Sequence, residues 1–169
     1  MSTVLYLVRH GETVDNASQT MQGQTQGALN ERGILQARAL SEEWCDREID
    51  VVVASDLKRA IDTAAIIAVP HGLEVVTTPL LRERDWGDFT GRYIPDLKNE
   101  PWPDNVESLE NLLSRAGEFI TYVRQTFPGK KVLAVGHGII NKAIQAVLYQ
   151  KSMSEILKMS NAEVRELVI

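Results

Sequence analysis

The chain has 169 residues, with 44% hydrophobic and 24% charged side chains, which is typical of a globular protein with a substantial core. Its formal net charge of −5 argues against nucleic-acid or anionic-membrane binding, since both need a basic face, but permits a small anionic substrate in a locally positive pocket. No apolar run approaches the roughly 20 residues of a membrane span, and the N-terminal apolar stretch lacks a basic leader. We therefore expect a cytoplasmic protein, monomeric or homodimeric, with no membrane or nucleic-acid partner.

The first half of the chain predicts three strands and two helices. Residues 4–8 form a short apolar run typical of a buried parallel strand, and a polar loop follows over 11–29. Asn30 is expected to cap a helix that continues through Trp44. Strands are predicted over 49–54 and 73–76, with a helix between them that Asp56 caps and that runs to residue 68. Cys45 is the only cysteine, which excludes an intrachain disulfide, and we interpret it as a small buried hydrophobe.

The second half begins with a long stretch, residues 79–103, that lacks periodicity and carries Pro, Gly and Trp. It is too aromatic for a flexible tether, so we interpret it as a functional loop. Asp104 with Glu107 resembles a capping box, which predicts a helix from there to residue 126. A strand over 131–135, a helix over 138–149, a short helix over 153–159 and a terminal strand over 164–169 complete the chain.

This alternation of strands and helices predicts an α/β fold, a three-layer α/β/α sandwich around a mostly parallel central sheet. The whole chain, residues 1–169, is expected to form one domain, with a short lid insertion at about 88–106. In open sheets of this kind, ligands bind at the carboxyl ends of the strands. Side chains that follow the strands are therefore the first candidates for a site.

Two histidines and two arginines occupy such positions. His10 directly follows the first strand beside Arg9, His137 follows the fourth strand, and Arg59 lies in the helix after the second strand. If these strand ends meet, the four side chains form an anion site that contains a nucleophile. Guanidinium groups bind phosphoryl oxygens through paired hydrogen bonds, and a neutral imidazole, with an ordinary pKa of about 6.5, is a good nucleophile near neutral pH.

Phosphoryl transfer also needs an acid for the leaving oxygen. Glu83 is the candidate, while Glu12 is expected to orient the loop beside the nucleophile. A hydrogen bond from one ring nitrogen of His10 to a backbone carbonyl would aim the other nitrogen at phosphorus. Each residue taken alone has an ordinary structural interpretation, and only the joint placement favours chemistry. His71 has no such support and is interpreted as a loop histidine.

Five sequence blocks in order resemble the histidine phosphatase superfamily, which includes the cofactor-dependent phosphoglycerate mutases. The blocks are LVRHGET (7–13), Gln22-Gly23 followed by LNERGILQARAL (29–40), SDLKRAIDTA (55–64), LRERDWGDFTG (81–91) and VGHG (135–138). Together they cover nearly the whole chain.

The resemblance implies a role for each matching residue. His10 would be the phosphorylated nucleophile and Glu83 the proton donor. Phosphate binding and transition-state stabilisation would fall to Arg9, Arg59 and His137, with substrate contacts from Asn16, Thr13, Gly23, Arg84 and Trp86. Members of the family transfer the phosphoryl group without a metal, so neither a metal nor another cofactor is expected.

The chain departs from the family pattern at three positions. Gln26 stands where an aspartate is common, Thr90 replaces a glutamate before Gly91, and Asp56 replaces a proline after Ser55. None of the three removes a reacting group. The first two are expected to affect the loop around the pocket.

Three functions remain open from the sequence. The short lid favours an open site, hence hydrolysis of a small phosphomonoester through a phosphohistidine at His10. A cofactor-dependent phosphoglycerate mutase is the alternative, because Arg82 and Arg84 could bind a second anionic group, although either could instead project into solvent. A non-catalytic phosphate-binding module is the third, and the presence of both nucleophile and acid disfavours it. The sequence does not identify the substrate.

Overall fold

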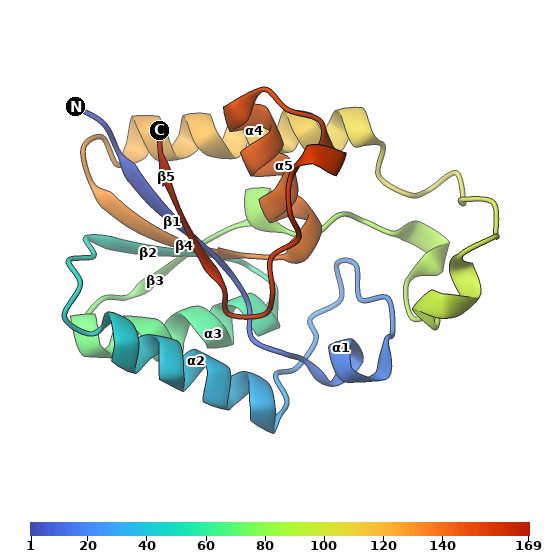
Figure 1. Ribbon diagram of the computed structural model, residues 1–169, viewed down its shortest axis with the longest axis horizontal. Coiled ribbons are helices and arrows are strands. Elements are labelled where there is room, and N and C mark those ends of the chain that lie inside the picture. Colours follow the sequence, from blue (N-terminus) through green and yellow to red (C-terminus); the bar gives the residue numbers. More distant parts are fainter.

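A five-stranded sheet forms the centre of the computed structural model, which describes all residues 1–169 (Figure 1). Its strands are β1 (Val4–Arg9), β2 (Val51–Ser55), β3 (Val75–Thr78), β4 (Lys131–Gly136) and β5 (Val164–Val168). Their order is β3-β2-β4-β1-β5. The first four are mutually parallel and β5 runs antiparallel to β1, so the sheet is mostly parallel as predicted.

Helices cover both faces of the sheet (Figure 1). They are α1 (Val14–Ser18), α2 (Glu31–Trp44), α3 (Lys58–Ala68), α4 (Leu109–Thr126) and α5 (Gly138–Tyr149). Short 3-10 turns lie at η1 (Val69–His71), η2 (Pro79–Leu81), η3 (Gly87–Phe89), η4 (Ile94–Leu97) and η5 (Met153–Glu155). One apolar core lies between the sheet and α4 with α5, and a second between the sheet and α2 with α3. The predicted three-layer α/β/α sandwich is confirmed.

The two predicted acidic helix caps are wrong, while the predicted Asn30 cap is confirmed. Asn30 Oδ1 accepts the Gly33 N–H of α2 at 2.8 Å. Asp56 does not cap α3, because its carboxylate pairs with Arg82 at 2.7 Å, and Leu57 occupies the N-cap position without a side-chain bond. At α4 the cap is Ser108, whose hydroxyl accepts from the Asn111 N–H, so the helix begins later than Asp104 predicts.

Two further predictions need correction. Cys45 is exposed rather than buried, because it lies just past the last turn of α2, where the neighbouring Trp44 takes the core position. The short helix predicted over 153–159 is only the single 3-10 turn η5, and extended chain follows it.

Residues 88–106, here called the insertion segment, contain most of η3 and all of η4 and project from the strand-end side of the sheet (Figure 1). Main-chain bonds join this segment to the loop after α1. Met21 N–H donates to Arg92 O at 2.9 Å, Gly91 N–H to Met21 O at 2.7 Å, and Ile94 N–H to Gln19 O at 2.8 Å. The insertion segment is therefore fixed against the loop that follows the first strand.

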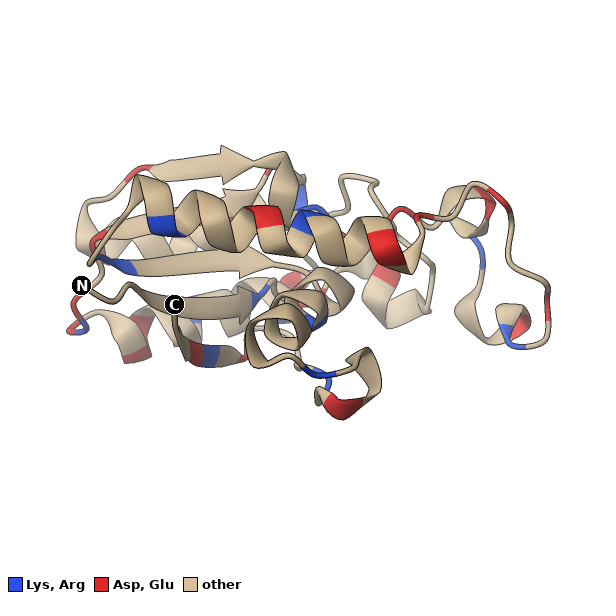
Figure 2. Cartoon of the chain, turned by 90° about the horizontal axis from the view of Figure 1, so that it is seen from above, with Lys and Arg blue, Asp and Glu red and all other residues tan.

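The surface charges are mixed in sign. Figure 2 shows basic and acidic residues alternating along α4, and no helix in the chain is long and apolar enough to cross a membrane. Because no basic face is present on this helix, the arginines near the strand ends are the candidates for the positive charge of an anion site.

Candidate active site

The strand ends bring the two histidines and Arg59 together. His10 follows β1, His137 follows β4, and Arg59 lies in the first turn of α3 after β2. The two imidazole rings have centroids 5.1 Å apart, in an edge-on arrangement. All three side chains are buried, at 2%, 0% and 1% exposure. Residues from three separate parts of the sequence therefore form one contiguous cluster.

His10 is held in a single tautomer. Its Nδ1 lies 2.7 Å from the Gly11 carbonyl oxygen, which can only accept, so Nδ1 donates and Nε2 keeps its lone pair. Burial, and after it the Arg59 charge, lower the pKa of His10 to about 3. The ring is therefore neutral at physiological pH, as a nucleophile must be.

His137 lies behind this ring. Its Nε2 is 2.9 Å from Ser55 Oγ, which also accepts the Leu57 N–H at 3.2 Å. Ser55 Oγ can either donate to Nε2 or accept from it, so this contact fixes the orientation of the His137 ring. Burial, followed by the charges of Arg59 and protonated His10, holds the pKa of His137 well below its usual value.

The arginines at the site are anchored by carbonyl groups. Arg59 donates from its terminal nitrogens to Gly23 O at 2.7 Å and to Thr25 O, and Arg9 donates to Met159 O at 2.8 Å. Burial lowers the pKa of Arg59 to about 10 and also lowers the pKa of Arg9, which leaves both charged at neutral pH. No anionic side chain forms an ion pair with either, so their positive charge is available to a bound anion.

Three buried side-chain nitrogens in this cluster have no partner within the protein: Nδ1 of His137 and the donors Arg9 Nε and Arg59 Nε. A buried donor that lacks a partner costs about 1–3 kcal/mol, so unpaired buried donors are rare. Their grouping around one nucleophile is the pattern expected of a site for a multivalent anion.

The Glu83 carboxylate lies at the N-terminus of α5. Oε1 accepts the N–H groups of Arg84 at 2.9 Å and Ile140 at 3.0 Å, and Oε2 accepts the Ile139 N–H at 3.0 Å. With two donors on Oε1 and one on Oε2, the oxygen with a free lone pair is Oε2. The three backbone donors fix this carboxyl group at the edge of the site.

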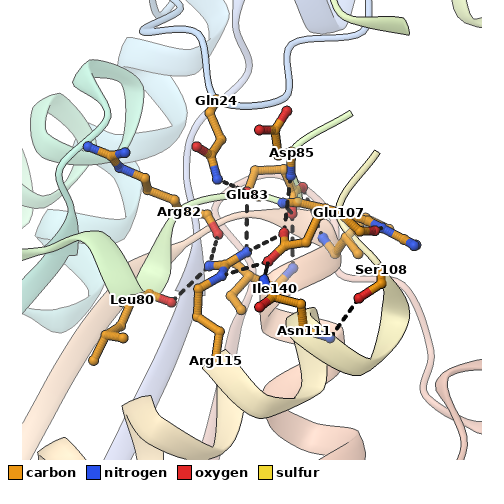
Figure 3. Close-up of polar contacts among 12 residues, drawn as sticks. Gln24, Leu80, Arg82, Glu83, Asp85, Glu107, Ser108, Asn111, Arg115 and Ile140 are labelled. Atoms are coloured by element: carbon orange, nitrogen blue, oxygen red, sulfur yellow. Dashed lines mark hydrogen bonds and ion pairs between the residues drawn. The ribbon is translucent and has the colours of Figure 1, made fainter. Parts of the chain in front are cut away.

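A buried ion pair supports the chain that carries Glu83 (Figure 3). Arg115 of α4 pairs with Glu107 at 2.8 Å, and its guanidinium also donates to Arg82 O at 2.6 Å and to Leu80 O at 3.0 Å. The Glu83 carbonyl accepts from Gln24 Nε2 at 3.2 Å and from Arg115 at 3.4 Å. Sequence reasoning missed Arg115, because a single arginine on an amphipathic helix looks like a solvated charge.

A cavity of about 270 Å³ opens beside His10. Here called the catalytic cavity, it is lined by the predicted residues Arg9, His10, Asn16, Gly23, Arg59, Glu83 and Trp86. It is also lined by Gln22 and Gly138, which belong to the sequence blocks described above, and by residues that the sequence did not single out: Thr20, Met21, Ile94, Ile139, Lys142 and Lys158. Lys142 and Lys158 form no ion pair, which adds two free cations to the two arginines.

Some predicted contact residues do not line this cavity. Thr13 is buried and donates to Gln22 Oε1 at 3.0 Å while capping α1. Arg84 donates to the Glu107 carbonyl and lies over the rings of Trp86 and Trp102, at 5.1 and 5.0 Å. His137 packs against the His10 ring rather than along the cavity wall.

Three other residues that the sequence singled out have structural partners. Arg82 forms its ion pair with Asp56, so it neither projects freely into solvent nor faces the catalytic cavity. Glu12 Oε1 accepts from Asn30 Nδ2 at 2.9 Å, which fixes the loop after His10 as expected. Gln26 contributes its side-chain oxygen to the Lys58 N–H at the start of α3, where it replaces the missing cap.

Comparison with known proteins agrees with this geometry. A family model, the histidine phosphatase superfamily (branch 1), matches residues 5–169. The "Uncharacterized phosphatase PhoE" of Bacillus subtilis (strain 168) is 41% identical over 154 residues, covering 89% of this chain and 78% of the relative. The "Metal-independent phosphoserine phosphatase" of Arabidopsis thaliana is 36% identical over 179 residues, covering 96% of this chain and 74% of the relative.

A solved structure, that of a mycobacterial glucosyl-3-phosphoglycerate phosphatase, superposes with a TM-score of 0.88 at 28% identity. The superposition covers 99% of this chain and 91% of that one. With the family model matched over almost every residue, the chain belongs to the histidine phosphatase superfamily and is a phosphatase of its first branch.

Proposed function

We propose that the chain hydrolyses small phosphomonoesters without a metal, through a phosphohistidine intermediate on His10. The observation that carries the proposal is the state of that ring: it is buried and neutral, its Nδ1–H is bound to Gly11 O, and it lines a cavity with Arg9 and Arg59. A nucleophile, a fixed direction of attack and charge for the transferred group are thereby combined.

The reaction has two steps. In the first, His10 Nε2 attacks phosphorus, the N–P bond forms and the ester P–O bond breaks, while Glu83 Oε2 gives its proton to the leaving oxygen. The Gly11 carbonyl stabilises the charge that develops on the ring. In the second, Glu83 takes a proton from water as the water oxygen attacks phosphorus, the N–P bond breaks, and inorganic phosphate leaves.

Hydrolysis is favoured over mutase action because the insertion segment contributes few residues to the wall of the catalytic cavity. A mutase must hold its substrate and exclude water long enough to return the phosphoryl group. From residues 88–106, only Ile94 lines the catalytic cavity, and Arg92 is paired with Glu100. Arg82 and Arg84, on which the mutase alternative depends, are engaged elsewhere.

The test is turnover of p-nitrophenyl phosphate in the presence of a chelator, combined with acid- and base-quench trapping. We expect a base-stable, acid-labile phosphoenzyme that maps to His10. His10→Ala should lower turnover by roughly a thousandfold or more. His71→Ala is the matched control, because His71 lies outside the catalytic cavity, and it should retain wild-type turnover.

Two results would overturn the proposal. One is phosphate trapped on a residue other than His10, and the other is a folded wild-type protein that turns over no ester. Rapid conversion of 3-phosphoglycerate to 2-phosphoglycerate with catalytic 2,3-bisphosphoglycerate, without release of phosphate, would establish the mutase instead.

A further inference from the structure

A second cavity, of about 460 Å³, lies next to the catalytic one and is apolar. Six of its eight lining residues are hydrophobic. Phe89, Leu97 and Trp102 of the insertion segment contribute to its wall. The catalytic reaction described above makes no use of this apolar cavity.

The two cavities adjoin each other. Met21, Trp86 and Ile94 line both of them. An ester whose phosphoryl group lies at His10 has these three side chains beside it, and an extended alcohol would follow them toward Trp102. This adjacency points to the occupant, because a group that passes these side chains from His10 is part of the substrate itself.

The apolar cavity is also preformed. The rings of Trp86 and Trp102 pack edge to face with centroids 5.3 Å apart, and the Arg84 guanidinium lies over both. Met21, which also lines the cavity, is fixed by its main-chain bonds with Gly91 and Arg92. A rigid aromatic wall binds an apolar group with little loss of side-chain entropy.

Two of its hydrophobic side chains are exposed to water, while Phe89 and Leu97 are buried, at 3% and 7% exposure. Ile94 and Trp102 are 44% and 55% exposed, although both are large and lie close together on one segment. Grouped exposure of this kind marks a binding site more often than scattered exposure does. Covering these side chains would be favourable in proportion to the apolar area removed from water.

We propose that the apolar cavity is a subsite for the alkyl or aryl body of the substrate, so that the enzyme prefers phosphomonoesters of apolar alcohols over those of small polar ones. This inference rests on the proposed function, because the phosphoryl group must first lie at His10.

The test is a series of ethyl, butyl, hexyl and octyl phosphate. The leaving alcohols differ little in acidity, so differences in kcat/KM report the binding of the chain rather than its departure. We expect kcat/KM to rise by about two- to fourfold for each methylene that becomes buried, and then to level off once the cavity is filled. Phosphate release is the readout throughout.

A pair of variants ties the effect to the apolar cavity. Trp102 lines only this cavity, so Trp102→Ala should lower the ratio of kcat/KM for hexyl over ethyl phosphate by about tenfold, while Trp102→Phe should retain most of the ratio. Tyr149→Ala is the control, since Tyr149 is a similarly exposed aromatic residue at the end of α5, and it should leave the ratio at the wild-type value.

If the wild type released phosphate from every ester with the same kcat/KM, the subsite would be refuted and the proposed function would remain. A ratio that Trp102→Ala does not change would do the same. If no ester released phosphate, the proposed function would fail, and the subsite with it.

Discussion

His10 shows how far burial beside cationic groups can change the pKa of a side chain. Its ring lies 2% exposed among cationic groups, and the two effects lower its pKa from about 6.5 to about 3. In the unfolded chain the same ring takes up a proton near pH 6.5. The folded state therefore binds fewer protons between these two pH values, and stability must increase with pH across that window.

We predict that the protein loses stability on acidification from pH 6.5 toward pH 3, with a contribution from His10 of at most about 1.4 kcal/mol for each pH unit. The slope fades above pH 6.5 and is absent at about pH 8, where the ring is neutral in both states. Urea unfolding at pH 5 and pH 7 measures this effect. The His10→Gln variant should show a smaller difference in the free energy of unfolding between pH 5 and pH 7. His71→Gln is the comparison, and a His10→Gln protein with the full wild-type difference would contradict the assignment.

The role of Glu83 as general acid can be tested with different leaving groups, because an acid increases the rate only when the leaving group needs a proton. Glu83→Gln should lower kcat on ethyl phosphate by on the order of 10²–10⁴-fold and kcat on p-nitrophenyl phosphate much less, since p-nitrophenolate leaves without protonation. Glu110→Gln, an exposed substitution on α4, serves as control. Equal losses on both esters would refute the acid role.

At the scale of elements, α4 does more than cover the sheet. Its Arg115 reaches the main chain just before Glu83 and forms an ion pair with Glu107, whose side chain is 6% exposed. Burial by itself raises the pKa of Glu107, but Arg115 and the neighbouring amide donors outweigh it, so the pKa lies below the usual value. The pair therefore remains charged inside the protein and holds the segment that carries the acid.

Removal of one partner of the Arg115–Glu107 ion pair should lower the free energy of unfolding. We expect Arg115→Met to lower the free energy of unfolding by about 1–3 kcal/mol, because the Glu107 carboxylate keeps its bonds from Asn111 and the Asp85 N–H but loses its counter-ion. The double variant with Glu107→Gln should recover part of the loss. Arg124→Met, an exposed position on the same helix, is the control. Urea unfolding of the four proteins provides the measurement, and equal losses in Arg115→Met and Arg124→Met would contradict the account.

At the scale of the whole molecule, segments far apart in the sequence meet at the nucleophile. Asn161 Nδ2 donates to His10 O at 3.0 Å and to Asn16 Oδ1 at 3.3 Å, and the Ala162 N–H donates to Arg9 O at 2.8 Å. The segment before β5 therefore supports the loop after β1 from the far end of the sequence.

We predict that Asn161→Ala destabilises the protein by about 1 kcal/mol and lowers kcat/KM, because the carbonyl of His10 and the side chain of Asn16 lose a shared donor. Asn99→Ala, on the exposed part of the insertion segment, should change neither quantity. Thermal unfolding and p-nitrophenyl phosphate turnover check the two effects. An Asn161→Ala protein with wild-type values of both would show that this link is dispensable.

The sequence predicted what depends on local pattern. The apolar run before Arg9, the Asn30 cap and the strand-helix alternation each follow from neighbouring residues, and each is confirmed. The clustering of His10, Arg59 and His137 followed from a rule about strand ends.

What the sequence could not predict depends on partners far along the chain. From the sequence Asp56 is a candidate helix cap, but in the structure it pairs with Arg82. Arg115 resembles a solvated charge in the sequence, but in the structure it pairs with Glu107. Lys142 and Lys158 have no local signal that would place them at a cavity.

The bonds between the insertion segment and the loop at Gln19 to Met21 involve only main-chain atoms. Gly91 needs the left-handed backbone that glycine favours, at a φ of +85°, but most amino acids other than proline can make the bonds at the other donor positions. The side chains of residues 88–106 could therefore differ widely without loss of the main-chain bonds that hold this segment beside the nucleophile. Grafting a segment of different polarity onto this scaffold should redirect the enzyme to other alcohols without altering the machinery that cleaves the P–O bond.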